Sequence, residues 1–262
     1  HGFAGLGDQG AAGLGKSTKS VLQHPEFLTD PTAAAEQVWR SGGGKVAPNG
    51  AVMRTAVCGI PFYWDRERVR ENSSVLCRAT HADPRCLASC HIVSCLVSEM
   101  LCAAESGLGH QKVEQDLQEM VDACVVEARD LLSDPEHIAD YQLHASKASL
   151  QELHLSEPHS IGYTFKCVFA SLLTLQEGAA RGEFASAMID LVMEGGDADT
   201  NGAVAGALLG CHLGYSALPR EWVNAMPYFM WLEAWVQKLL WMLQLPTTVN
   251  RGGVTTRSSQ AM

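Results

Sequence analysis

The sequence predicts an all-α fold in a single domain. Apolar residues recur at three- and four-residue spacing over several long segments, which is the periodicity of amphipathic helices. Asp-Pro pairs at 30–31 and 83–84 offer an N-cap followed by proline at the first helical position. No stretch shows the apolar–polar alternation of a half-buried strand. With 262 residues, 47% of them hydrophobic, the chain can bury a core without disulfides or a structural metal.

The N-terminal part contains two predicted helices separated by a turn. Residues 1–20 are rich in glycine and lysine and are expected to form a loop with a weak helix. A capped helix follows and is ended by glycines, and a turn and a buried apolar run then lead to a long second helix. These elements are Thr32 to Arg40, glycines 42–44, the turn Pro48-Asn49-Gly50, the run from Ala51 to Ile60 and the helix from Pro84 to about Ala104.

The C-terminal part contains five further helical patterns, at 112–132, 162–180, 183–194, 201–214 and 220–243. Segment 133–161 is polar, has four histidines and is ambiguous. Segment 226–245 has three tryptophans and is expected to be an amphipathic helix on the core. We therefore expect one domain over residues 1–246 and a disordered tail over 247–262, where threonine, serine and glycine dominate.

The charge balance argues against nucleic-acid and membrane partners. Lysine and arginine total 19 against 29 aspartate and glutamate residues, so the formal net charge is −10. An acidic chain without a basic run is a poor non-specific binder of nucleic acid or anionic lipid. The nine cysteines are odd in number and form no Cys-x-x-Cys pair, so we expect free thiols in a cytoplasmic protein.

Residues Gly10 to Ser17 match the phosphate-loop pattern G-x-x-x-x-G-K-[ST]. Such a loop surrounds phosphates with backbone N–H groups, provided that it connects a buried strand to a helix. Residues 1–9 contain no apolar strand, and the overlapping G-x-G-x-x-G match from Gly5 to Gly10 fails the same test. The sequence therefore does not favour a nucleotide triphosphatase.

Cys86, Cys90, His91 and Cys95 have a spacing that is compatible with zinc ligands. On a helix, residues 86 and 90 share one face, whereas 91 and 95 share another face about 100° away. Four ligands cannot converge from these two faces without a second segment, so we expect the side chains to pack in the core.

Glycines 202, 206, 210 and 214 form a small-residue stripe of the kind that also occurs in membrane helices. The apolar run around them falls short of the roughly 20 residues that a span needs, and His212 interrupts it. We therefore expect the stripe to let two helices of a soluble protein approach closely.

Asp197, Asp199 and Thr200 form the most informative chemical pattern. They follow Gly195 and Gly196, which permit a sharp turn, and they precede a predicted helix. Their hard oxygen atoms suit Mg²⁺ or a similar cation. Asp199 or Thr200 can equally serve as an N-cap that needs no metal, so both interpretations stay open on the residues alone.

The whole stretch at 195–210 resembles the C-terminal metal motif of the ADP-ribosylglycohydrolase family, which includes dinitrogenase reductase-activating glycohydrolase and the ADP-ribosyl-acceptor hydrolases. Three other segments resemble family motifs in the same order along the chain. They are Pro48-Asn49-Gly50-Ala51-Val52-Met53-Arg54, Thr80-His81 before a long helix, and Gly162-Tyr163 before the next helix. The resemblance extends over about residues 40–245.

The resemblance implies an orthogonal all-α bundle that binds two divalent cations, usually Mg²⁺, beside the ribose of ADP-ribose. It implies a hydrolase that cleaves the glycosidic bond between ADP-ribose and an acceptor, with ADP-ribose or an ADP-ribosylated protein as partner. Its site residues fall on Asp197, Asp199 and Thr200 as metal ligands, on Asn49 and Gly50 at the diphosphate, and on His81 as a substrate contact.

One departure from the family pattern affects the metal site. Family members carry a second motif, Thr-Asp-Asp, near the N-terminus, and the nearest string in this sequence is Thr29-Asp30-Pro31. We therefore expect an N-terminally incomplete domain with half of the binuclear site, unless carboxylates such as Asp8 or Glu36 complete it. Two functions remain open: a hydrolase of this family, and a non-catalytic relative with a binding or structural role, as in the crystallin members.

Overall fold

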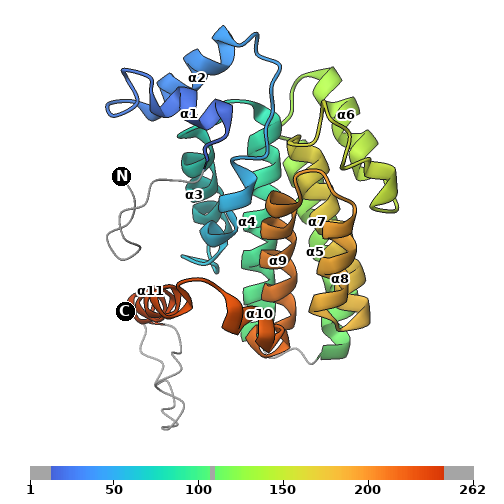
Figure 1. Cartoon of the computed structure of the whole chain (residues 1–262). Coiled ribbons are helices and arrows are strands. Elements are labelled where there is room, and N and C mark those ends of the chain that lie inside the picture. Colours follow the sequence, from blue (N-terminus) through green and yellow to red (C-terminus); the bar gives the residue numbers. More distant parts are fainter. Residues whose placement is uncertain (1–12, 107–109, 245–262) are drawn as a thin grey trace. The chain divides into compact units, whose positions relative to one another are not determined.

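The computed structural model describes residues 13–106 and 110–244, with the backbone alone for residues 110–115. Within these ranges every regular element is a helix, and the β-type pairing consists of a single isolated bridge between Pro48 and Tyr163 (Figure 1). The predicted all-α fold is confirmed. The described residues form two compact units, one from Gly13 to Leu218 and one that contains residues 219–244.

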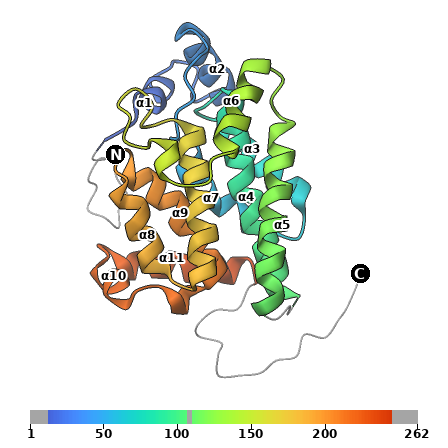
Figure 2. The same ribbon diagram turned by 90° about the vertical axis from the view of Figure 1, so that its right-hand side faces the viewer.

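Helix α4 (Pro84–Glu105) is the central element of the larger unit. Asp83 caps it by accepting the backbone N–H of Arg85 at 2.9 Å, and Pro84 occupies the first helical position as predicted. Most of its 22 residues are buried, because four other α-helices pack against it (Figures 1 and 2). These are α3 (Arg66–Arg78), α5 (His110–Arg129), α7 (Thr164–Arg181) and α9 (Ala198–Leu213).

The length and composition of α4 would also allow it to cross a membrane, and it is the one described helix of which this is true. Its burial inside the protein is, however, that of a core helix in a helical bundle. Cys86, Cys90 and Cys95 are among its buried side chains, in agreement with the core interpretation of the cysteine pattern. All nine cysteines of the chain are free thiols in the structure.

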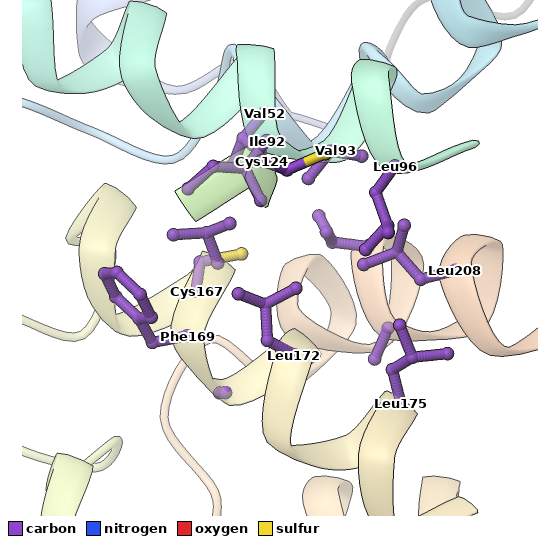
Figure 3. Packing of buried hydrophobic residues seen from close by; sticks show 14 of the residues in the cluster. Val52, Ile92, Val93, Leu96, Cys124, Cys167, Phe169, Leu172, Leu175 and Leu208 are labelled. Carbon is purple, nitrogen blue, oxygen red and sulfur yellow. The ribbon is translucent and has the colours of Figure 1, made fainter. Parts of the chain in front are cut away.

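The main core lies where α4, α7 and α9 meet. Figure 3 shows Ile92 and Leu96 of α4 opposite Leu172 of α7 and Leu208 of α9, and all four side chains are buried. Burying one such side chain stabilises a protein by about 1.5–3 kcal/mol. This core fixes α9, and with it the segment that precedes α9, against the rest of the larger unit.

The glycine stripe of α9 faces α8 (Phe184–Met193), as expected of a helix contact. A Cβ atom placed on Gly206 would lie 3.5 Å from Cε of Met188, which is an ordinary contact distance, so alanine would also fit. A closer approach lies between α7 and α9. There a Cβ on Gly178 would lie 2.6 Å from Cδ2 of Leu209.

Several other predicted elements agree with the structure. Helix α2 (Pro31–Ser41) is capped by Asp30, whose Oδ1 accepts the N–H of Ala33 at 2.9 Å. The apolar run after Gly50 forms the 3₁₀ helices η2 (Val52–Arg54) and η3 (Ala56–Gly59). The weak N-terminal helix is α1 (Lys16–Leu22). Within the described ranges no strand precedes it, and the Gly5–Gly10 pattern lies outside them.

Four expectations need correction or completion. Helix α3 was not predicted, because its sequence is strongly polar and only Val69, Ser73 and Cys77 are buried. The ambiguous segment contains α6 (Pro135–Ala145) and the 3₁₀ helix η4 (Gln151–Leu153). The pattern at 220–243 is two helices, α10 (Arg220–Ala225) and α11 (Phe229–Met242), and α11 has no buried residue instead of the expected core face. The predicted tail at 247–262 lies outside the described residues.

Candidate functional site

The turn before α9 needs both of its glycines. Gly195 and Gly196 have φ angles of 73° and 72°, a backbone region that favours glycine. A Cβ atom on Gly196 would lie only 2.1 Å from the carbonyl oxygen of Leu155, so a larger residue cannot fit there without a backbone shift. The turn thereby fixes the position of Asp197, the first residue of the predicted metal motif.

Asp197 occupies the N-cap position of α9, but its side chain makes no capping hydrogen bond. The carboxylate instead accepts a hydrogen bond from Nδ2 of Asn49, with 2.7 Å between Nδ2 and Oδ2. The interpretation of the acidic pair as simple helix caps therefore does not account for Asp197. Asp199 and Thr200 follow within the first turn of the helix, so they are not N-cap residues either.

Asn49 is held in place by the segment around Tyr163. Its backbone N–H donates to the carbonyl of Gly162 at 2.9 Å, and Thr164 N–H donates to the carbonyl of Ala47 at 3.0 Å. A Cβ on Gly162 would lie 3.7 Å from Oδ1 of Asn49 and 3.8 Å from Oδ2 of Asp197, so this glycine borders both side chains. Three motifs that are distant in the sequence thus meet at one point.

The two carboxylates of the motif lie against each other. Burial first, and then the neighbouring carboxylate of Asp199, raise the pKa of Asp197, while the proximity of Asp197 lowers the pKa of Asp199. The N–H of Thr200 donates to Oδ1 of Asp199 at 2.8 Å. The hydroxyl of this buried residue lies 3.8 Å from Sδ of Met53 and also interacts with the carboxylate of Asp197, whose pKa it lowers. Two adjacent carboxylates favour either a shared proton or a bound cation.

The donor set fits one hard cation better than two. It offers two carboxylates and one hydroxyl, and an octahedral Mg²⁺ usually completes such a set with water. In the described part of the chain, no group of three or more histidine, cysteine, aspartate or glutamate residues is arranged to hold a metal. Glu36 forms an ion pair with Arg40 on α2, and Asp8 lies outside the described residues.

His81 borders the Asn49–Gly50 turn on the other side. A Cβ on Gly50 would lie 3.1 Å from Nε2 of His81, so the backbone of Gly50 packs closely against this nitrogen. His81 is only 4% exposed, and its Nδ1 lies 2.7 Å from Oγ1 of Thr80. Burial and the charge of Arg54 lower the pKa of His81 to about 4, so the ring is neutral at pH 7.

A cavity of about 250 Å³ adjoins His81 and was not predicted from the sequence. Trp39 of α2 lies in its wall, and the indole Nε1 donates to Oδ2 of Asp83 at 3.1 Å. Lys16 and Ser17 of α1 also line it, and their phosphate-loop pattern was the one sequence signal at this place. The cavity combines apolar walls with a few polar groups, which is typical of a small-molecule site.

The predicted site residues therefore fall into two adjoining groups. Asn49, Asp197, Asp199 and Thr200 form one polar cluster, while Gly50 and His81 lie together beside the cavity. The residues of the hypothetical zinc pattern do not join either group as ligands. Cys86 instead supports the turn, because its thiol donates to the carbonyl of Pro48 at 3.3 Å.

Comparison with known proteins gives one clear match. A family model described as ADP-ribosylglycohydrolase matches residues 4–248, which is nearly the whole chain. A comparison with curated proteins finds no match.

Proposed function

Because the chain belongs to the ADP-ribosylglycohydrolase family, we propose that it is a metal-dependent hydrolase of the glycosidic bond between ADP-ribose and an acceptor. The acceptor in this proposal is a protein side chain or a small molecule. The observation that carries it is the placement of Asp197, which begins α9 but turns its carboxylate toward Asn49 and Asp199. A carboxylate that makes no capping hydrogen bond to its own helix is available to a ligand.

Asp197, Asp199 and Thr200 would hold a Mg²⁺ ion. When bound, such a cation supplies a Lewis acid that polarises oxygen atoms of the ribose and positions water. Asn49 keeps Oδ2 of Asp197 hydrogen-bonded, and so orients the other carboxylate oxygen without competing for it. The net charge of −10 means that the diphosphate must be held by local geometry, which Asn49 and the bare backbone at Gly50 provide.

A second candidate function is a non-catalytic relative that binds ADP-ribose without hydrolysing it. The observation that favours it is the ligand count, since the described residues place two carboxylates at the site and no third carboxylate, histidine or cysteine beside them. Two carboxylates do not offset the mutual repulsion of two closely spaced dications. Hydrolysis therefore depends on whether one cation suffices.

Titration calorimetry with MgCl₂, beside a hydrolysis assay on ADP-ribosylated arginine and serine peptides, tests both candidates. We expect one Mg²⁺ site of weak affinity, on the order of millimolar, as for other sites with few carboxylates. Asp199→Ala should abolish this binding, because it removes half of the carboxylate charge. Asp130→Asn is the matched control, since Asp130 is exposed and pairs only with Arg129.

The two assays separate the outcomes. Mg²⁺-dependent release of ADP-ribose, lost in Asp199→Ala and kept in Asp130→Asn, would support the hydrolase. ADP-ribose binding without release would support the non-catalytic relative. Mg²⁺ binding that is unchanged in Asp199→Ala would contradict the metal site itself.

A further inference from the structure

His81 has one ring nitrogen without a partner. Nε2 is buried, and no hydrogen bond to it exists among the described residues. Buried polar atoms are nearly always hydrogen-bonded, so an unpartnered one indicates a ligand or an ordered water. His81 lines the cavity beside α1 and α2, so an oxygen atom of a ligand bound in that cavity can supply the missing partner.

The other ring nitrogen, Nδ1, lies at the end of a chain of hydrogen bonds that starts at Arg54. One terminal nitrogen of Arg54, Nη2, donates both to the carbonyl of Leu76, at 3.1 Å, and to the hydroxyl of Thr80. Thr80 Oγ1 then lies 2.7 Å from Nδ1 of His81. Thr80 is itself buried, so water does not compete for its hydroxyl.

The direction of these bonds follows from what each group can donate. A guanidinium has only donors, so the Thr80 hydroxyl must accept from Arg54. The hydroxyl has a single hydrogen, and His81 Nδ1 is the one acceptor bonded to it in the described part of the protein. When Thr80 donates to Nδ1, the proton of the neutral imidazole resides on Nε2.

We propose that Arg54 and Thr80 are positioning residues that hold His81 in the tautomer with its proton on Nε2, so that the ring offers one neutral N–H donor to an oxygen atom of the bound nucleotide-sugar. The ligand class rests on the proposed function, whereas the tautomer does not. The oxygen acceptor would belong to a ligand in the cavity that His81 and Thr80 line.

A neutral donor suits this place. The pKa of His81 is lowered by burial and by the Arg54 charge, so the ring does not gain a proton at neutral pH. A neutral N–H can bind a phosphate or hydroxyl oxygen without adding a second positive charge beside Arg54. The bond would satisfy the one polar atom of His81 that the protein leaves unpartnered.

Nitrogen NMR of the protein with ¹⁵N-labelled histidine measures the tautomer directly. His81→Asn identifies the His81 signals among those of the ten histidines. We expect a protonated Nε2 and an unprotonated Nδ1 in the wild type and in Thr80→Ser, which keeps the hydroxyl. Thr80→Val should lose this preference. Thr174→Val is the matched control, because the buried hydroxyl of Thr174 donates only to the carbonyl of Ala170 within α7.

Calorimetric titration with ADP-ribose in the presence of Mg²⁺ tests whether the Nε2–H group of His81 binds the nucleotide-sugar. Thr80→Val should bind about tenfold more weakly than the wild type, as expected for one hydrogen bond, and Thr80→Ser should recover most of the affinity. A proton on Nδ1 in the wild type would overturn the inference, and that spectrum decides the point even if Thr80→Val does not fold.

An unchanged affinity of Thr80→Val despite an altered tautomer would also overturn it. Failure of the wild type to bind ADP-ribose would instead count against the proposed function, and the two failures are thus distinguishable.

Discussion

Replacing Gly196 by alanine should destabilise the protein more than the same change at the adjacent Gly195. Both residues have a φ angle near +70°, and alanine in this region costs about 1–2 kcal/mol. At Gly195 the new methyl group would meet Cβ of Ser156 at 3.7 Å, which is an ordinary contact. At Gly196 it would lie 2.1 Å from the carbonyl oxygen of Leu155, so the backbone must move.

The difference between the two variants isolates this contact. Forcing a methyl group into a filled space costs a further 1–3 kcal/mol, roughly, and the effect of alanine on the unfolded chain is the same at both positions. We therefore expect Gly196→Ala to be about 2 kcal/mol less stable than Gly195→Ala. Urea unfolding followed by circular dichroism at 222 nm measures this as a midpoint lower by about 1 M.

Gly182→Ala is a useful third variant, because Gly182 ends α7 with a φ of 66° and has no atom near its Cβ position. It should resemble Gly195→Ala. Equal midpoints for Gly195→Ala and Gly196→Ala would refute the idea that the turn is pressed against Leu155. Because Asp197 follows directly, Gly196→Ala should also weaken Mg²⁺ binding more than Gly182→Ala does.

Three further predictions concern packing and pH. Gly178→Ala should destabilise the protein by about 1 kcal/mol or more. Leu209→Ala should cost less in the Gly178→Ala background than in the wild type, because it removes the two methyl groups that lie 2.6 and 2.8 Å from the new Cβ. A double-mutant cycle by urea unfolding measures this coupling. Leu208→Ala should cost about 2–5 kcal/mol in the same assay, against about 0.5 kcal/mol or less for the exposed Val126→Ala. Burial lowers the pKa of His91 from 6.5 to about 4, so the stability that its neutral form contributes is complete above pH 6.5 and is lost as the pH falls toward 4. His91→Gln should therefore flatten the pH dependence of the unfolding free energy over this range. An unchanged slope in the variant would contradict the prediction.

The helices that the sequence predicted well are those with strong end signals. Asp30-Pro31 and Asp83-Pro84 begin α2 and α4 at the expected residues, because an N-cap and a proline act locally and need no tertiary partner. Helix α3 was not predicted, although Asp65 caps it, because its sequence is strongly polar and only one of its faces is buried. The break between α10 and α11 was not predicted either, because apolar residues continue across it at Met226.

The site was predictable as a set of motifs but not as a geometry. The sequence pointed to Asn49 and Asp197 separately, while the hydrogen bond between them depends on how α4, α7 and α9 pack. The cavity beside His81 depends likewise on where α1 and α2 lie, so Trp39 carried no recognisable signal. The roles of Arg54 and Thr80 follow from bond directions that only coordinates reveal.

The bond between Asn49 and Asp197 joins residues 148 positions apart, and this separation has a consequence for protein synthesis. Closing so long a loop costs conformational entropy, which is offset only once the intervening helices have packed. A nascent chain therefore exposes Asn49 and His81 long before either carboxylate of the acidic pair has been translated. Any product that terminates before residue 197 would retain Asn49 and His81 yet lack both carboxylates, so the polar cluster can form only after ribosomes have passed Asp199.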